Sequence, residues 1–179
     1  MTISFNKTGT RTNSFLGDSF QSEYIFVTLT ELPIAKLTYS DFKASIKFNE
    51  TTYNIERVPG SWTNKYLILD GDSTIGHIDA GSWLNRFSVT LSTDKVFKLK
   101  RRYKSVLDRL TNWTNYNIQL QSVDEIVTYE FVKGVSFEKG NSNQRNKELK
   151  GKMNVDIDNL PVALFGIFLI EQMLNQEVD

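Results

Sequence analysis

Residues 160–170 read Leu-Pro-Val-Ala-Leu-Phe-Gly-Ile-Phe-Leu-Ile, a run of eleven residues without one polar side chain. Asp158 and Asn159 precede this run as candidate capping residues, and Pro161 suits the first turn of a helix. A helix that is apolar on every side has to be surrounded by protein or by lipid. The run therefore predicts a helix over about residues 160–174 that is enclosed all round.

The length of the run decides what encloses it. A helix needs about 20 apolar residues to span a bilayer, and only eleven precede Glu171, so the chain is predicted not to be transmembrane. A helix lying on one sheet face would keep a polar stripe. We therefore expect the helix to lie inside a closed or nearly closed β-barrel. Ala163 and Gly166 fall on one face, where a strand or ring could approach closely.

The preceding residues alternate between apolar and polar side chains, which is the pattern of half-buried strands. Ile46 and Phe48 alternate with polar neighbours, and Asp70-Gly71 is a strong tight-turn signal between two apolar runs. We expect about 10–12 antiparallel strands, with a turn at Lys133-Gly134 and a last strand that runs as far as Ile157. The fold class is therefore mainly β, or α+β by count of element types.

The chain has 179 residues, a length that fits one domain. Residues 1–20 are rich in Thr, Ser, Asn and Gly and are predicted to form an irregular N-terminal arm. Residues 21–179 are predicted to form the single β-barrel domain.

The composition narrows the functional classes. The 21 basic and 21 acidic residues give no net charge, which argues against a nucleic-acid binder. The absence of Cys excludes disulfides, thiolate nucleophiles and zinc–thiolate sites. No apolar segment marks the N-terminus as a signal peptide, so we expect a cytoplasmic protein.

The order of these features resembles the tubby-like superfamily, which includes the tubby, phospholipid-scramblase and LURP-one-related proteins. The resemblance covers residues 20–175. It lies in many antiparallel strands, the Asp70-Gly71 turn followed by residues 75–78 (Ile-Gly-His-Ile), Trp83, and an all-apolar C-terminal helix. It implies a twelve-stranded barrel filled by that helix. Family members have been linked to phosphoinositide binding, lipid movement and defence signalling, and no common enzymatic activity defines them.

Candidate catalytic groups are few. His77 is the only histidine, so a multi-histidine metal site is excluded, and we interpret it as a strand residue. Gly-Asp-Ser segments begin at Gly17 and Gly71, and one group of hydrolases carries its serine nucleophile in such a segment. This chain lacks the second histidine and the strand–helix alternation of those hydrolases. We predict no catalytic residues, no metal site and no cofactor.

One sequence feature suggests a binding function. It is a basic stripe formed by Lys98, Lys100, Arg102 and Lys104. On a strand these alternate side chains share one face, while Phe97 and Leu99 share the other. Residues 93–109 hold seven basic and two acidic side chains. A second basic run contains Lys139, Arg145, Lys147, Lys150 and Lys152 against Glu148.

These observations predict a non-catalytic binding or scaffold module with a basic barrel face. Its partner would be anionic, such as a phosphoinositide-like lipid, a membrane surface or a nucleotide. The alternative is a protein–protein interaction domain with no small ligand, and a hydrolase using Ser or carboxylate pairs is the third interpretation. The simpler interpretation of the stripe is a solvated strand face, because lysines on an edge strand also discourage aggregation.

Overall fold

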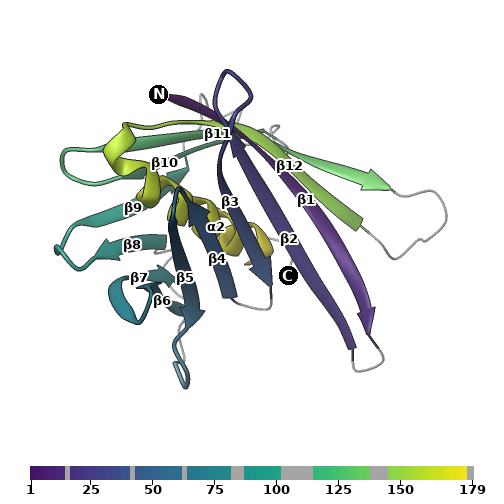
Figure 1. The fold of residues 1–179 in the computed structure, drawn as a ribbon, viewed down its shortest axis with the longest axis horizontal. Coiled ribbons are helices and arrows are strands. Elements are labelled where there is room, and N and C mark those ends of the chain that lie inside the picture. Colours follow the sequence, from purple (N-terminus) through teal and green to yellow (C-terminus); the bar gives the residue numbers. More distant parts are fainter. Residues whose placement is uncertain are drawn as a thin grey trace.

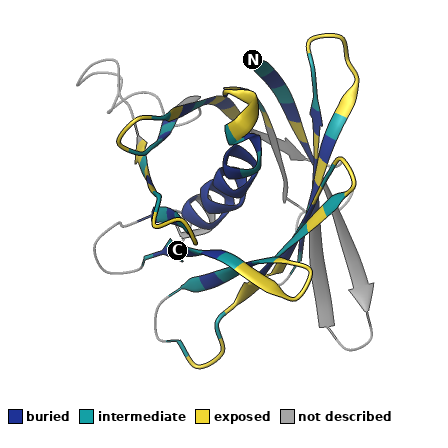
Figure 2. Ribbon diagram, turned by 60° about the vertical axis from the view of Figure 1, so that its left-hand side comes forward, coloured by how far each residue is buried: buried dark blue, intermediate teal, exposed yellow. Residues whose placement is uncertain are grey.

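The computed structural model describes residues 1–14, 17–40, 43–61, 64–81, 87–101, 115–137 and 145–176. Twelve antiparallel strands form a closed β-barrel, and one long C-terminal helix runs through it (Figures 1 and 2). The predicted mainly-β fold with an enclosed helix is therefore confirmed. Among the residues described, no helix is long and apolar enough to cross a membrane.

The strands follow one another around the barrel, and β12 closes it against β1. In the closing pair, Ile3 lies opposite Met153. The strands are β1 (Thr2–Ser14), β2 (Gly17–Val27), β3 (Pro33–Ser40), β4 (Lys43–Phe48), β5 (Thr51–Arg57), β6 (Lys65–Asp70), β7 (Ser73–Ala80), β8 (Phe87–Leu91), β9 (Val96–Arg101), β10 (Asn115–Gln121), β11 (Ile126–Phe137) and β12 (Arg145–Asn154).

The turn chemistry explains this up-and-down order. Asp70 pairs with Ser73 across the predicted Asp-Gly turn, and Gly71 has a φ of +56°, a conformation that glycine adopts at little cost. Asn49, between β4 and β5, also has a positive φ of 54°, which Asn tolerates better than most residues. The hairpin expected at Asp70-Gly71 is therefore present, and a second hairpin joins β4 to β5.

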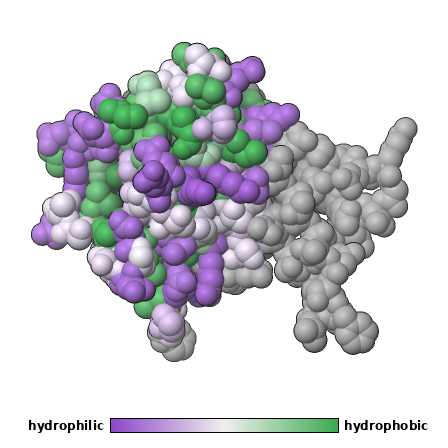
Figure 3. Space-filling model, viewed as in Figure 1, coloured by the Kyte–Doolittle hydropathy of each residue, from purple (hydrophilic) through white to green (hydrophobic). Residues whose placement is uncertain are grey.

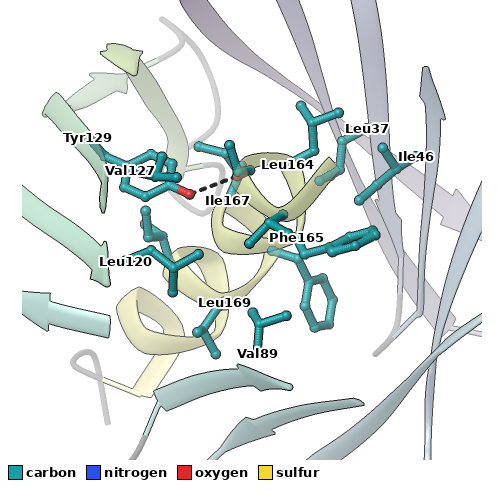
Figure 4. Close-up of a cluster of buried hydrophobic side chains, with 14 of the residues drawn as sticks. Leu37, Ile46, Val89, Leu120, Val127, Tyr129, Leu164, Phe165, Ile167 and Leu169 are labelled. Carbon is teal, nitrogen blue, oxygen red and sulfur yellow. Dashed lines mark hydrogen bonds between the residues drawn. The ribbon is translucent and has the colours of Figure 1, made fainter. Parts of the chain in front are cut away.

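Helix α2 (Leu160–Gln176) lies along the inside of the barrel and is buried over almost its whole described length (Figure 2). The short 3₁₀ turn η1 (Ile157–Asn159) leads into it, so the predicted capping residues belong to this turn. Phe165 packs edge-on against Tyr53, with ring centroids 5.4 Å apart. Leu37 and Ile46 lie on one side of α2, and Leu120 and Val127 on another, so the helix is the centre of the hydrophobic core (Figure 4).

Gly166 has the role expected of a small residue in this helix. The Tyr129 hydroxyl donates a hydrogen bond of 2.9 Å to the Ala163 carbonyl oxygen (Figure 4). A Cβ on Gly166 would lie 2.1 Å from that same hydroxyl, a separation that no side chain tolerates. The absence of a side chain therefore lets the ring reach the helix backbone.

Three expectations are wrong. The segment 1–20 is not an irregular arm, because its backbone pairs with β12 on one side and within the β1–β2 hairpin, and alternate residues Ile3 and Phe5 are buried. Lys133-Gly134 is not a turn, because Gly134 pairs with Glu148 inside a continuous ladder. The last strand does not run as far as Ile157 but ends at Asn154. Ile157 is 59% exposed in η1, because the chain must leave the barrel wall before it enters the interior.

Candidate functional site on the outer barrel wall

The basic stripe predicted from the sequence lies in part on β9. Lys98 and Lys100 are exposed and point outward from β9, whereas Phe97, on the inner face of the same strand, is buried. Arg102 and Lys104 lie outside the described residues. The structure thus confirms a shared outer face for two of the four predicted residues.

Among the described residues, the side chains directly opposite the two lysines are neutral. Lys98 lies opposite Gln121 on β10 and Ser88 on β8, and Lys100 lies opposite Gln119. The Lys100 ammonium donates a hydrogen bond of 3.3 Å to Gln121 Oε1. Because the cross-strand neighbours carry no negative charge, this part of the wall keeps its positive charge.

A second pair of exposed lysines, Lys150 and Lys152, lies on the outer side of β12. Lys152 is opposite Glu130 on β11, and Lys150 is opposite the exposed Val132. Strands β10 and β11 lie between the two lysine pairs, so the pairs are three strand spacings, or about 14 Å, apart across the strands. They are also offset along the strands, because the row of Lys100 reaches β12 at Asn154, two residues beyond Lys152. We call Lys98, Lys100, Lys150 and Lys152 the basic face.

His77 lies on the outer side of β7, as expected for a strand residue. Its Nε2 atom is 3.5 Å from Asp79 Oδ2, and both side chains are partly exposed. Within the part of the chain that the structure describes, no three His, Cys, Asp or Glu side chains gather as a metal site. The His77–Asp79 pair is therefore a solvated surface contact.

A cluster of buried polar side chains inside the barrel was not predicted from the sequence. Lys7 Nζ lies 2.5 Å from Glu171 Oε1, and both side chains are about 95% buried. The Tyr24 hydroxyl donates to Glu171 Oε2, and the Lys7 ammonium lies 5.6 Å from the Tyr24 ring centroid. These contacts tie the last turns of α2 to β1 and β2.

Gln172 extends the cluster to β6. The Tyr66 hydroxyl donates a hydrogen bond of 3.0 Å to Gln172 Oε1. A polar residue in a helix enclosed by a barrel must find a partner there, and this was the one signal in the sequence. The partner could not be named from sequence, because Lys7 fell in the segment predicted to be irregular.

Burial raises the pKa values of the tyrosines in the cluster. The pKa of Tyr24 is raised well above its usual value, first by burial and then by the Glu171 carboxylate. Burial, followed by the nearby Tyr39, raises the pKa of Tyr66 to about 12. Both hydroxyls therefore stay protonated and able to donate throughout the neutral range.

We expect the protein to lose stability as the pH rises above 10. In the unfolded chain these tyrosines ionise near pH 10, whereas in the folded chain they hold their protons to higher pH. The folded state then binds more protons, and the free energy of unfolding falls by up to about 1.4 kcal/mol per pH unit for each such tyrosine. Urea unfolding at pH 8, 9, 10 and 11 measures this; Tyr66→Phe should reduce the slope above pH 10. A free energy that is constant from pH 9 to 11 would contradict the burial of these hydroxyls.

Comparison of the chain with models of protein families, with curated proteins and with solved structures finds no match. The architecture that the tubby-like resemblance implies is present, and membership of that superfamily remains a prediction.

Proposed function

We propose that this chain is a non-catalytic binding module that uses the basic face of its barrel to bind an anionic partner. The favoured partner is a membrane surface that carries anionic lipid headgroups, phosphoinositide-like lipids among them. The observation that carries the proposal is the pair of exposed lysines on β9, set among neutral side chains on β8 and β10, with a second exposed pair on β12.

The filled interior supports a binding surface on the outside. Helix α2 and the inward side chains of the strands make one hydrophobic core, so the barrel axis is occupied by the protein itself. In many barrels of other kinds the interior holds the ligand. Here the outward side chains are the ones that a partner can reach. The tubby-like resemblance favours the same kind of partner.

The test is cosedimentation with vesicles containing phosphatidylserine. Each Lys near an anionic membrane contributes about 1 kcal/mol, so Lys98→Glu/Lys100→Glu should weaken binding by at least tenfold. Raising the salt should also weaken binding of the unmodified chain, because exposed charges are screened beyond about 8–10 Å near physiological ionic strength.

Lys43→Glu/Lys47→Glu is the matched control. These two exposed lysines lie on β4, five strands from β9 around the barrel, and the double substitution makes the same change in net charge. The control should bind like the unmodified chain. If the β4 and β9 variants lose binding equally, only the net charge matters and the basic face is not the site. If the unmodified chain does not sediment with these vesicles at low salt, the membrane partner is wrong.

A further inference from the structure

A groove of about 620 Å³ crosses the outer wall over β12, β1 and β2. It is a shallow groove that is open to solvent, not an enclosed cavity. Its lining residues are Ser4, Phe5, Asn6, Ile25, Val27, Lys150, Gly151 and Lys152. The strand registers place six of them in two rows that run straight across the three strands, Lys152–Ser4–Val27 and Lys150–Asn6–Ile25.

The two rows have the same order of chemistry. Each begins with a lysine on β12, passes a neutral polar side chain on β1, and ends with an aliphatic side chain on β2. The distance from β12 to β2 is two strand spacings, or about 9–10 Å. One end of the groove is therefore cationic and the other end is apolar.

The apolar end continues beyond the groove. Ile25 is 39% exposed, and the turn that follows Val27 presents Leu29 and Leu32, which are 75% and 63% exposed. Figure 3 shows hydrophobic residues at the top of the molecule, where Figure 1 places the turn between β2 and β3. Exposed aliphatic side chains of this kind can bind an apolar group. The row of Ile25 itself ends at the charged Lys36 on β3.

The barrel wall divides next to this groove. Pairing between β1 and β12 ends at Asn6 and Lys150. The β1–β2 ladder continues to the Ser14–Gly17 pair, and the β11–β12 ladder to the Phe137–Arg145 pair. The two hairpins diverge from this point (Figure 1), so the groove lies where the wall begins to split and is hollowed for that reason.

We infer that this groove binds a single-chain anionic amphiphile, with a phosphate held by Lys150 and Lys152 and an alkyl chain lying over Ile25 and Val27. Lysine binds phosphate as a point charge and makes no demand on the orientation of the oxygens. The aliphatic residues opposite give the alkyl chain a surface that a bare anion would not use. The inference rests on the proposed function only in sharing the two β12 lysines.

Titration with octyl phosphate and butyl phosphate, below the concentrations at which they form micelles, tests the inference. Each methylene that becomes buried tightens binding by up to about fourfold, which corresponds to about 0.8 kcal/mol. Octyl phosphate should therefore bind at least tenfold more tightly than butyl phosphate. In amide NMR spectra the shifts should be centred on Ser4, Ile25 and Gly151.

Three variants separate the two ends of the groove. Lys150→Glu/Lys152→Glu should weaken octyl phosphate binding at least tenfold, and Lys43→Glu/Lys47→Glu should leave it unchanged. Ile25→Ser/Val27→Ser should abolish the difference between octyl and butyl phosphate while butyl phosphate still binds. Octylammonium should bind at least tenfold more weakly than octyl phosphate.

The inference is wrong if chain length has no effect in the unmodified protein, or if octylammonium binds as tightly as octyl phosphate. The Lys98→Glu/Lys100→Glu variant separates this result from the proposed function, because it should keep octyl phosphate binding and lose vesicle binding. If vesicles bind through Lys98 and Lys100 but octyl phosphate does not bind, the groove assignment fails alone. If octyl phosphate binds as described and vesicles do not, the membrane proposal fails alone.

Discussion

Replacing Phe168 with Ala should lower the free energy of unfolding by about 3–5 kcal/mol, the usual cost of removing a buried Phe ring. Phe168 lies at the centre of the barrel, where it packs edge-on against Tyr66 at 5.0 Å and against Tyr39 at 5.8 Å between ring centroids. The cavity would be enclosed by both the helix and the wall, so the surroundings have little freedom to collapse into it. Urea unfolding and thermal melting measure the effect.

The matched control is Phe48→Ala on β4. Phe48 is only partly buried and packs at the margin of the core, so its loss should cost markedly less. In a chain of this length each kcal/mol lowers the melting temperature by about 2–4 °C, so the two variants are easily told apart. Equal destabilisation by the two substitutions would mean that α2 is not the centre of the core.

Lys7→Met should destabilise the protein by about 3–5 kcal/mol, because it leaves the Glu171 carboxylate buried without its cation. The Lys7–Glu171 contact of 2.5 Å joins β1 to α2 across 164 residues of sequence. Glu171→Leu alone should also be destabilising, since it leaves the Lys7 ammonium buried without its carboxylate partner. Chemical unfolding of both single variants and of the double variant gives the coupling between the two side chains.

The double variant Lys7→Met/Glu171→Leu is the informative member of this cycle. A buried ion pair replaced by apolar side chains of similar size is often close to neutral in stability. We therefore expect the double variant to be more stable than either single variant, which requires a coupling energy larger than the cost of Lys7→Met alone, at least about 3 kcal/mol. Strict additivity of the two losses would show that the charges do not interact in the folded chain.

The helix and the barrel could be predicted because each follows from a local pattern. The apolar run at residues 160–170 is too short for a bilayer and too apolar for one sheet face, which left an enclosing barrel as the solution. Alternation and the Asp70-Gly71 turn then located most of the strands. Gly166 could be predicted to allow a close approach, although the ring that uses it, Tyr129, could not be named.

The features that escaped prediction depend on pairings between distant parts of the chain. Strand β1 is mostly polar, and only Ile3 and Phe5 show the alternation that marks the other strands. Its backbone is satisfied by β12 and β2 together, a pairing that cannot be predicted from the local sequence. The Lys7–Glu171 pair and the groove likewise form only when β1 pairs with β12 and closes the barrel. Lys150 and Lys152 were visible as part of a basic run in the sequence. Ile25 and Val27 lie across one groove from them because β1 pairs with both β12 and β2.

The most direct test of binding on the outer wall is an amide NMR spectrum of the protein with nanodiscs containing phosphatidylserine. A small share of lipid with a paramagnetic headgroup is included in the discs, because paramagnetic broadening falls steeply with distance from the headgroup. We expect the signals of the four lysines of the basic face to lose most intensity. The signals of Phe165 and Phe168 on the enclosed helix should lose no more than the average. Loss concentrated on the helix, or on Lys43 and Lys47 of β4, would contradict binding by the basic face.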